Sequence, residues 1–261
     1  GQLGNGSSST QSVPVSVSGI STASKVYAGE NHSCALLQDG SFKCWGNQND
    51  GQLGDGYFTL EKSPKQIPGV NNATDLSVGP NHTCVRQTSG QASCWGDNTY
   101  GQLGNGSTSS QSTVVNVSGI STATQVSVGS QFTCSRLSDS TVKCWGYGGY
   151  GQLGNDNSSN QLTPVSVSGI SNATQASSGY KHSCARLSDG TSKCWGYGGH
   201  GRLGNVSSSS SNIPVSVTDI SSVAEISAGV DHTCARKSDN TIWCWGYGGY
   251  YRLGNGDLYD R

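Results

Sequence analysis

Charged residues are scarce in this sequence, which contains only 12% Asp, Glu, Lys and Arg and has a formal net charge of −1. Proteins that bind nucleic acid through its phosphates carry an excess of basic residues, so we expect no nucleic-acid partner. No apolar run approaches the roughly 18 residues of a membrane-spanning helix, so we also expect no membrane span. Methionine is absent and other helix-forming residues are few, which argues against a helical fold.

The short motifs of the common enzyme classes are missing as well. The sequence contains no Gly-x-Ser-x-Gly nucleophile elbow, no phosphate-binding loop and no metalloprotease motif. We therefore expect a protein that is not an enzyme and that uses no cofactor.

Glycine is abundant, at 38 of 261 residues, and Ser and Thr are frequent. Val, Ile, Thr, Tyr and Trp stand between these glycine-rich breaks. Residues of this kind favour strands and the breaks favour turns, so we predict an all-β fold with many turns.

A repeat of 50 residues organises the chain. The motif Gly-Gln-Leu-Gly begins at residues 1, 51, 101 and 151, and related forms begin at 201 and 251. The triplet Cys-Trp-Gly begins at 44, 94, 144, 194 and 244. We predict a single domain over residues 1–261, with repeats that start near 1, 51, 101, 151 and 201 and a tail at 251–261. A fixed period of this length indicates a solenoid, an array or a propeller.

Each repeat is predicted to contain four short strands. In the third repeat they lie at residues 125–128, 132–137, 141–145 and 163–167. Four antiparallel strands repeated radially form the blade of a β-propeller, so we predict a five-bladed propeller. A solenoid is the alternative, but it would leave two exposed edges that need caps.

Two segments near the ends of the chain suggest how the ring closes. Residues 13–17 have the sequence of a fourth strand, whereas the last repeat has a third strand at 241–245 and no fourth. We predict that the N-terminal strand, near residues 12–17, completes the last blade. This pairing would close the ring and remove both open edges.

The segment AGENHSCALLQDGSFKCWGNQNDGQLGDG, residues 28–56, closely resembles a repeat of the regulator of chromosome condensation family, and the match recurs over nearly the whole chain. The resemblance implies a β-propeller, here of a secreted, disulfide-bearing variety. The best-known members have seven blades, whereas this chain has five repeats. The nuclear member is an exchange factor for the GTPase Ran and also binds chromatin. Its activity uses a wedge-like insertion that these evenly spaced repeats lack, so the resemblance implies the fold and not that activity.

Ten cysteines form five pairs, each with a separation of ten residues. Between Cys34 and Cys44, residues 38–40 predict a three-residue hairpin loop with glycine at its left-handed position. That register pairs Leu37 with Ser41 and places the two cysteines opposite each other, with Cα atoms about 4.5 Å apart. A zinc site would need closer cysteines or pairs of histidines. We predict five disulfides and an oxidising compartment, secreted or at the cell surface, with the pairs Cys34–Cys44, Cys84–Cys94, Cys134–Cys144, Cys184–Cys194 and Cys234–Cys244.

Histidine recurs two residues before the first cysteine of four repeats, and Phe132 takes its place in the third. A catalytic histidine needs a carboxylate and a nucleophile in the same cleft, and equivalent positions around a ring share no cleft. We expect each histidine to bond backbone groups within its own blade, and the recurrent tryptophans to pack in the core. The histidines are His32, His82, His182 and His232.

The loop after the third strand carries the candidate binding residues. It contains Tyr-Gly-Gly-Tyr at 147–150, Tyr-Gly-Gly-His at 197–200 and Tyr-Gly-Gly-Tyr at 247–250. All five such loops leave the same face of a propeller, and tyrosine among small polar residues suits contact with a protein or a glycan. The alternative is that the tyrosines pack on the neighbouring blade. The candidate partner-binding residues are Tyr100, Tyr147, Tyr150, Tyr197, His200, Tyr247 and Tyr250.

A second hypothesis is a structural subunit that associates into an oligomer or a fibre. Residues 1–6 and 252–256 are two copies of one loop. A closed ring needs only one copy, which would leave the other free to contact a neighbouring molecule.

Asn-x-Ser/Thr sequons recur along the chain and are expected to carry glycans if the protein comes from a eukaryote. Two of them, at Asn31 and Asn81, lie immediately before a strand, where we expect poor access. The remaining candidate glycosylation sites are Asn5, Asn72, Asn105, Asn116, Asn157, Asn172 and Asn205.

Overall fold

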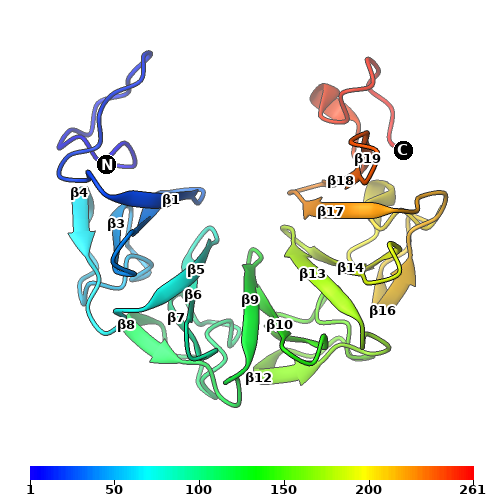
Figure 1. Ribbon diagram of the computed structural model, residues 1–261, viewed down its shortest axis with the longest axis horizontal. Helices are drawn as coiled ribbons and strands as arrows, with labels where there is room; N and C mark the ends of the chain where they lie inside the picture. The colour runs from blue at the N-terminus through cyan, green and yellow to red at the C-terminus, as the bar shows by residue number, and fades with distance from the viewer.

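A computed structural model describes all 261 residues, which form five antiparallel β-sheets arranged side by side in an arc (Figure 1). Four sheets contain four strands and the last contains three. The first strand of each sheet lies toward the centre of the arc, and the later strands follow in chain order toward the rim (Figure 1). These sheets are the predicted propeller blades.

The blades follow the repeats. Blade 1 contains β1 (Ala23–Ala28), β2 (His32–Leu37), β3 (Phe42–Gly46) and β4 (Glu61–Gln66). Blade 2 contains β5 (Ala73–Val78), β6 (His82–Gln87), β7 (Ala92–Gly96) and β8 (Gln111–Asn116). Blade 3 contains β9 (Ala123–Val128), β10 (Phe132–Leu137), β11 (Val142–Gly146) and β12 (Gln161–Ser166). Blade 4 contains β13 (Ala173–Ser178), β14 (His182–Leu187), β15 (Ser192–Gly196) and β16 (Ser211–Ser216). Blade 5 contains β17 (Val223–Ala228), β18 (His232–Lys237) and β19 (Ile242–Gly246). Short 3-10 turns follow the third strands of blades 4 and 5, at η1 (Gly199–Gly201) and η2 (Gly249–Tyr251).

The Gly-Gln-Leu-Gly motif joins each blade to the next. At the junction of blades 1 and 2, the carbonyl oxygen of Gln52 accepts hydrogen bonds from Trp95 Nε1 and Thr83 Oγ1, both at 2.9 Å. Leu53 is fully buried in the same hydrophobic cluster as Trp95. Gly54 has φ +82°, and a Cβ there would approach Trp95 Nε1 to 2.7 Å, which only glycine avoids. The repeated motif is therefore one of the contacts that join neighbouring blades.

The hydrophobic core is divided among the interfaces. One cluster lies between each pair of neighbouring blades, as between blades 3 and 4, where Phe132 of one blade and Trp195 of the next share a cluster. Four tryptophans of the Cys-Trp-Gly triplets are buried at these interfaces, and the fifth, Trp45, is buried against the N-terminal segment. Core packing of the tryptophans is therefore as predicted, and the four at the interfaces are Trp95, Trp145, Trp195 and Trp245.

All five predicted disulfides are present, and no cysteine is free. Each joins the two middle strands of its own blade, with Cα atoms 4.0–4.1 Å apart. The hairpin turn also has the predicted form, since Leu37 N–H donates to Ser41 O and Gly40 has φ +78°.

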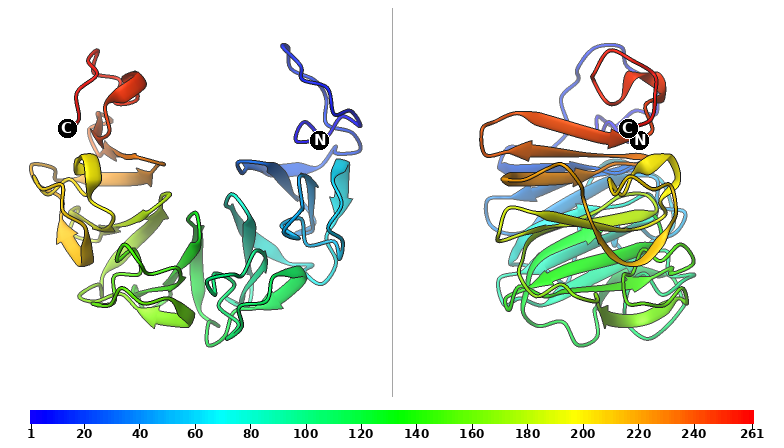
Figure 2. Two further views of the ribbon diagram at one scale, coloured as in Figure 1. Left: turned by 180° about the vertical axis from the view of Figure 1, so that it is seen from behind. Right: turned by 90° about the vertical axis from the view of Figure 1, so that its right-hand side faces the viewer.

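Closure of the ring by the N-terminal strand is not confirmed. Residues 13–17 form no strand, β19 has no fourth strand beside it, and the two ends of the chain lie on opposite sides of the opening (Figures 1 and 2). The N-terminal segment packs instead on blade 1, where Trp45 Nε1 donates to Gln2 O and Val17 packs against the hydrophobic cluster that contains Trp45. The interfaces between blades repeat similar contacts, such as the bond from a tryptophan Nε1 to the carbonyl oxygen of Gln52, Gln102, Gln152 or Arg202, so successive blades turn by a similar step. The four steps between the five blades leave the ring open.

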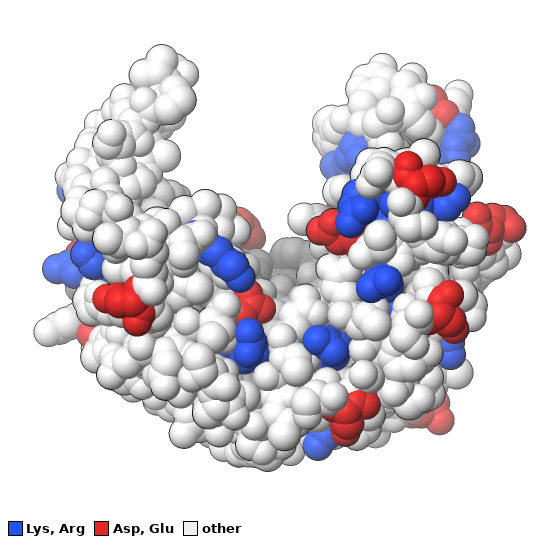
Figure 3. Space-filling view, viewed as in Figure 1, with Lys and Arg blue, Asp and Glu red and all other residues white.

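Charges of both signs are interspersed over the face shown in Figure 3, and the opening of the arc separates the ends of the molecule. Nowhere does the structure contain a helix with the length and apolar character needed to cross a membrane.

Candidate functional site

Two loops of every blade leave the same side of the arc. The first joins the first and second strands, at residues 29–31 in blade 1, and the other joins the third and fourth strands, at 47–60. Because neighbouring strands are antiparallel, these connections meet at one end of the blade. We call this side of the molecule the loop face.

Four tyrosines form a continuous series across blades 2 to 4. The ring centroids of Tyr100 and Tyr147 lie 5.0 Å apart, those of Tyr147 and Tyr150 lie 5.7 Å apart, and those of Tyr150 and Tyr197 lie 5.3 Å apart. All three pairs are edge-to-face, a geometry that contributes about 0.5–1.5 kcal/mol per pair beyond area burial. We call Tyr100, Tyr147, Tyr150 and Tyr197 the tyrosine ladder.

The Gly-Gly dipeptide between the tyrosines allows this arrangement. A Cβ on Gly149 would overlap the ring of Tyr147, and a Cβ on Gly148 would overlap the carbonyl oxygen of Ser159. Glycine at both positions lets the tyrosine ring fold back over its own loop. The Tyr-Gly-Gly-Tyr sequence is therefore required for the ladder and is more than a flexible connector.

A pocket of about 300 Å³ opens beside the ladder between blades 3 and 4. The Nζ of Lys181 lies over the ring of Tyr150, 4.9 Å from its centroid, and 5.8–5.9 Å from the centroids of Tyr197 and Tyr180. A cation at these distances is attracted by the ring electrons. We call it the Lys181 pocket, and its lining residues are Tyr100, Ser130, Gln131, Tyr147, Tyr150, Gln152, Tyr180 and Lys181.

Blades 4 and 5 carry a second aromatic and cationic group. His200 lies against Tyr247 with ring centroids 4.7 Å apart, and the guanidinium of Arg252 lies 4.7 Å from the Tyr247 centroid. Asp231 accepts from Arg202 at 2.8 Å and pairs with Arg252 at 3.5 Å. These two cations therefore have a carboxylate partner within the chain.

Blades 1 and 2 present a different surface. A residue at position 50 of one repeat meets a residue at position 47 of the next, as in Tyr100–Tyr147, and at the first junction this pair is Asp50 and Asp97. Burial and the nearby charge of Asp97 raise the pKa of Asp50. At the junction of blades 1 and 2 the loop face therefore carries a pair of carboxylates, whereas the later junctions carry aromatic pairs.

The structure brings some of the predicted partner-binding residues together and leaves others apart. The four ladder tyrosines meet, and His200 and Tyr247 form a separate pair. Tyr250 is 84% exposed and stands near Arg252. Sequence reasoning missed Tyr180 and Lys181. The available signal was that the short loops leave the same face as the long ones, and that blade 4 alone has Tyr-Lys there.

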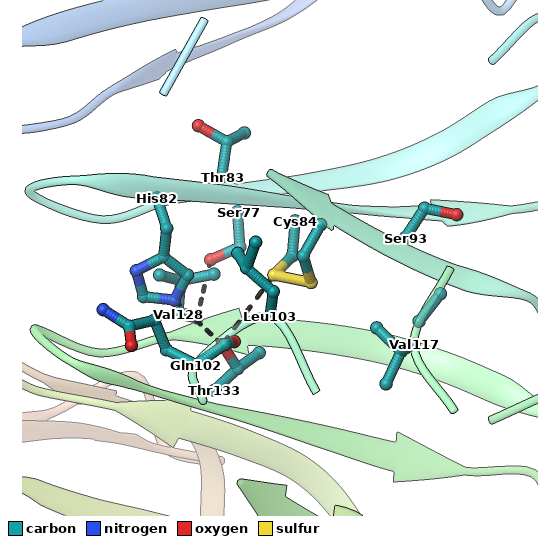
Figure 4. Close-up of a disulfide and its surroundings, with 12 residues drawn as sticks. Ser77, His82, Thr83, Cys84, Ser93, Gln102, Leu103, Val117, Val128 and Thr133 are labelled. Carbon is teal, nitrogen blue, oxygen red and sulfur yellow. Dashed lines mark hydrogen bonds between the residues drawn. A yellow bond between two sulfur atoms is a disulfide. The ribbon is translucent and has the colours of Figure 1, made fainter. Parts of the chain in front are cut away.

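The recurrent histidines begin the second strands, directly after the short loops, and three of them, His32, His82 and His182, are buried at the interfaces between blades. His82 Nε2 bonds Thr133 Oγ1 of the next blade at 2.9 Å, and Thr133 donates to Gln102 O at 3.0 Å (Figure 4). The expected bond to backbone within the same blade is wrong, because the ring packs against the next blade, where Nε2 meets the threonine hydroxyl. Burial lowers the pKa of His82 to about 3. The side chain is therefore neutral near pH 7.

The candidate glycosylation sites differ in access. Asn72, Asn116 and Asn157 are exposed, while Asn5, Asn105, Asn172 and Asn205 are partly buried. The structure contains no group of three or more His, Cys, Asp or Glu side chains arranged to hold a metal ion.

Comparison with known proteins identifies the fold. The family model described as "RCC1-like domain" matches residues 1–261. Human WBSCR16 superposes with a TM-score of 0.82 and 22% identity over 90% of this chain and 64% of its own. Prp20p from Saccharomyces cerevisiae superposes with a TM-score of 0.81 and 21% identity over 91% of this chain and 61% of its own. The ectodomain of the Physcomitrella patens receptor kinase CR4 superposes with a TM-score of 0.57 and 21% identity over 86% of this chain and 52% of its own.

This chain spans less than two thirds of each of these structures. At these identities, the likeness shows a shared fold. No curated protein matches the sequence.

Proposed function

Because the chain belongs to the RCC1-like domain family, we propose that it is a non-enzymatic binding module that contacts a protein partner through its loop face. The observation that carries this proposal is the tyrosine ladder beside the Lys181 pocket. Rigid aromatic side chains supply large contact areas at a low entropic cost, and such residues dominate the energetics of many interfaces. Prp20p, which shares the fold, binds Gsp1p and histones. That precedent supports a protein rather than a glycan as the partner.

The proposed site of action is outside the cell or on its surface. Five disulfides persist in oxidising compartments and are rare in the cytosol. The CR4 ectodomain, an extracellular part of a receptor, shares the fold. In a eukaryotic host, the exposed sequons at Asn72, Asn116 and Asn157 are the first positions where glycans are expected.

Tyrosine substitutions at the loop face test the proposal. A peptide array and a glycan array are probed with the wild-type chain and with Tyr150→Ala and Tyr250→Ala. Trp243→Ala is the matched control, because Trp243 is a 49% exposed aromatic residue on β19, outside the loops. We expect the chain that carries both tyrosine substitutions to bind the best ligand at least about tenfold more weakly than the wild type does, since aromatic anchors contribute about 2 kcal/mol or more. Equal loss in the control, or no loss in either variant, would contradict the proposal.

Self-association is a second candidate function, supported by a separate observation. The outer edge of β19 is paired only by the two bonds between Gly246 and Arg261, and residues 11–17, which match the fourth strands in sequence, pair with no strand. By the register of blade 4, Val15 of one copy would face Cys244 of another. Light scattering after size-exclusion chromatography tests this role. A monomer at all concentrations, or an oligomer that Val15→Asp leaves intact, would contradict it.

A further inference from the structure

Lys181 differs from the other cations of the loop face. Apart from Arg261, the loops of this face contain three Lys or Arg side chains. Two of them, Arg202 and Arg252, pair with Asp231. Lys181 Nζ has no carboxylate within 4.0 Å and donates no hydrogen bond, and no Asp or Glu lines its pocket. An ammonium group held over tyrosine rings and without a counter-ion is therefore available to an anion.

Gln152 adds a second free donor to the same pocket. The side chain is only 1% exposed, and its Oε1 accepts a hydrogen bond from Tyr150 N–H at 3.0 Å. This bond fixes the amide orientation and leaves Nε2, which donates to no group of the chain, as the remaining polar atom. Because Nε2 is not among the fully enclosed polar atoms that lack a partner, it reaches the pocket, where a ligand can supply its acceptor.

Blade 2 shows which acceptor this donor takes. There, Gln102 is the equivalent of Gln152, and its Oε1 accepts from Tyr100 N–H at 2.9 Å. Its Nε2 donates to the carboxylate of Asp97 at 2.7 Å. In blade 3 the residue equivalent to Asp97 is Tyr147, so the carboxylate is missing.

The rings of the pocket are engaged within the chain. Lys181 lies over Tyr150 and Arg202 lies over Tyr197, while the ladder pairs are edge-to-face. A sugar ring binds aromatic side chains by stacking on an open face. The free groups here are hydrogen-bond donors, which suit a carboxylate better than a pyranose ring.

We propose that the Lys181 pocket binds the carboxylate of an Asp or Glu side chain in an acidic segment of a protein partner, an inference that rests on the proposed function. Lys181 Nζ and Gln152 Nε2 donate to the carboxylate oxygens, as Gln102 does to Asp97. The pocket volume of about 300 Å³ accepts one side chain and not a folded domain. The neighbouring tyrosines contact the rest of the segment.

Fluorescence anisotropy with a labelled peptide tests the inference. The probe is an octapeptide of alternating Glu and Gly, and its matched control has Gln in place of Glu. Lys181→Gln removes the charge and keeps the length of the side chain, and Lys62→Gln removes a charge from an exposed lysine on β4. We expect the Glu peptide to bind the wild type and Lys62→Gln equally and Lys181→Gln about tenfold more weakly, with affinity that falls as salt is added.

Several outcomes would overturn it: no binding of the Glu peptide to the wild type at millimolar concentration, equal binding of the Gln peptide, or no effect of Lys181→Gln. Lys181-dependent binding of tetragalacturonate in place of the peptide would also overturn the assignment to a protein. The proposed function is judged separately. If Tyr250→Ala still weakens binding of an array ligand while the Glu peptide fails, the binding module stands and the carboxylate inference falls.

Discussion

At the scale of single residues, the repeated positions matter mainly for the contacts they make with the next repeat. His32, His82 and His182 each bond a threonine hydroxyl of the following blade, at 2.8–2.9 Å. Because that threonine donates its proton to a backbone carbonyl, as Thr133 does to Gln102, the histidine donates from Nε2 and its Nδ1 is left without a partner. The sequence places these histidines at equivalent positions, but their partners depend on how the blades pack.

The buried histidines predict a fall in stability as the solution becomes acidic. Burial lowers the pKa of His32 to about 4 and those of His82 and His182 to about 3, from an ordinary value of 6.5. At pH values between the lowered pKa values and the ordinary pKa, the unfolded chain binds more protons than the folded chain. The free energy of unfolding therefore decreases as the pH falls below 6.5. We expect a loss of about 2 kcal/mol for each of His82 and His182 between pH 6.5 and pH 5.

Urea unfolding at a series of pH values measures this loss. His82→Phe is the matched variant, because the third repeat already carries Phe132 at this position. Its free energy of unfolding should depend less on pH than that of the wild type. An identical pH dependence in both proteins would contradict the assignment to the histidines.

The second glycine of Gly-Gln-Leu-Gly predicts a large effect of a small substitution. Gly154 has φ +67°, and a Cβ there would lie 2.7 Å from Trp195 Nε1. Gly154→Ala is expected to lower the free energy of unfolding by about 2–4 kcal/mol, through backbone strain and overpacking together. Gly169, with φ +64° and no atom within 4 Å of an added Cβ, is the control. Gly169→Ala should cost only about 1–2 kcal/mol, and equal losses in chemical denaturation would show that the tryptophan contact does not matter.

At the scale of elements, the hairpin of the middle strands could be predicted from sequence and the outer strand less well. The observed β10, Phe132–Leu137, has the predicted bounds, because the turn residues and the two cysteines together determine the register. The outer strand β12 begins at Gln161, two residues before the predicted start. It follows a long loop, and its bounds depend on contacts with the preceding blade that no local pattern encodes, such as the bond from Gly106 N–H to Leu162 O.

The disulfides predict how each blade responds to reduction. Each closes a loop of about 11 residues, which contributes on the order of 3 kcal/mol in the chain-entropy model. Replacing both Cys134 and Cys144 with Ala should therefore lower the free energy of unfolding, measured by chemical denaturation, by about 2–3 kcal/mol.

Mass spectrometry without reductant should find all ten cysteines bridged, each to its partner ten residues away. Labelling of the native protein by a thiol reagent would contradict this pairing.

At the scale of the whole molecule, the number of blades could be predicted and the shape of the ring could not. The count follows from the repeats, and five sheets are observed. Closure depends on the angle between blades, which is set by the shapes of buried side chains such as Trp195 against Phe132. For the same reason the sequence indicated the aromatic loops but not the contact of Lys181 with Tyr150, which come from different blades.

An open arc of similar units predicts uneven protection of its backbone. Stability in such arrays is approximately the sum of the repeats and their interfaces, so end blades with one interface unfold most easily. In β10 five of six residues are buried, whereas β19 begins with three residues that are exposed or partly exposed. We expect amide hydrogens of β6, β10 and β14 to exchange more slowly than those of β18 and β19, by mass spectrometry after proteolysis. Uniform exchange across the five blades would indicate a fully cooperative molecule and contradict this picture.

The interfaces also determine how a gene for this protein can change in length. Residues that meet across a junction are supplied by successive repeats, and the residue that faces the histidine position of the preceding repeat carries a hydroxyl at every junction, at Thr83, Thr133, Ser183 and Thr233. Unequal recombination that removes residues 51–100 would bring His32 opposite Thr133, an equivalent partner, and the junction would still form. On the loop face the same event would place Asp50 beside Tyr147, a pair that this chain does not contain. Recombination can therefore add or remove blades while the junctions persist, and each event produces a new combination of residues for selection to act on.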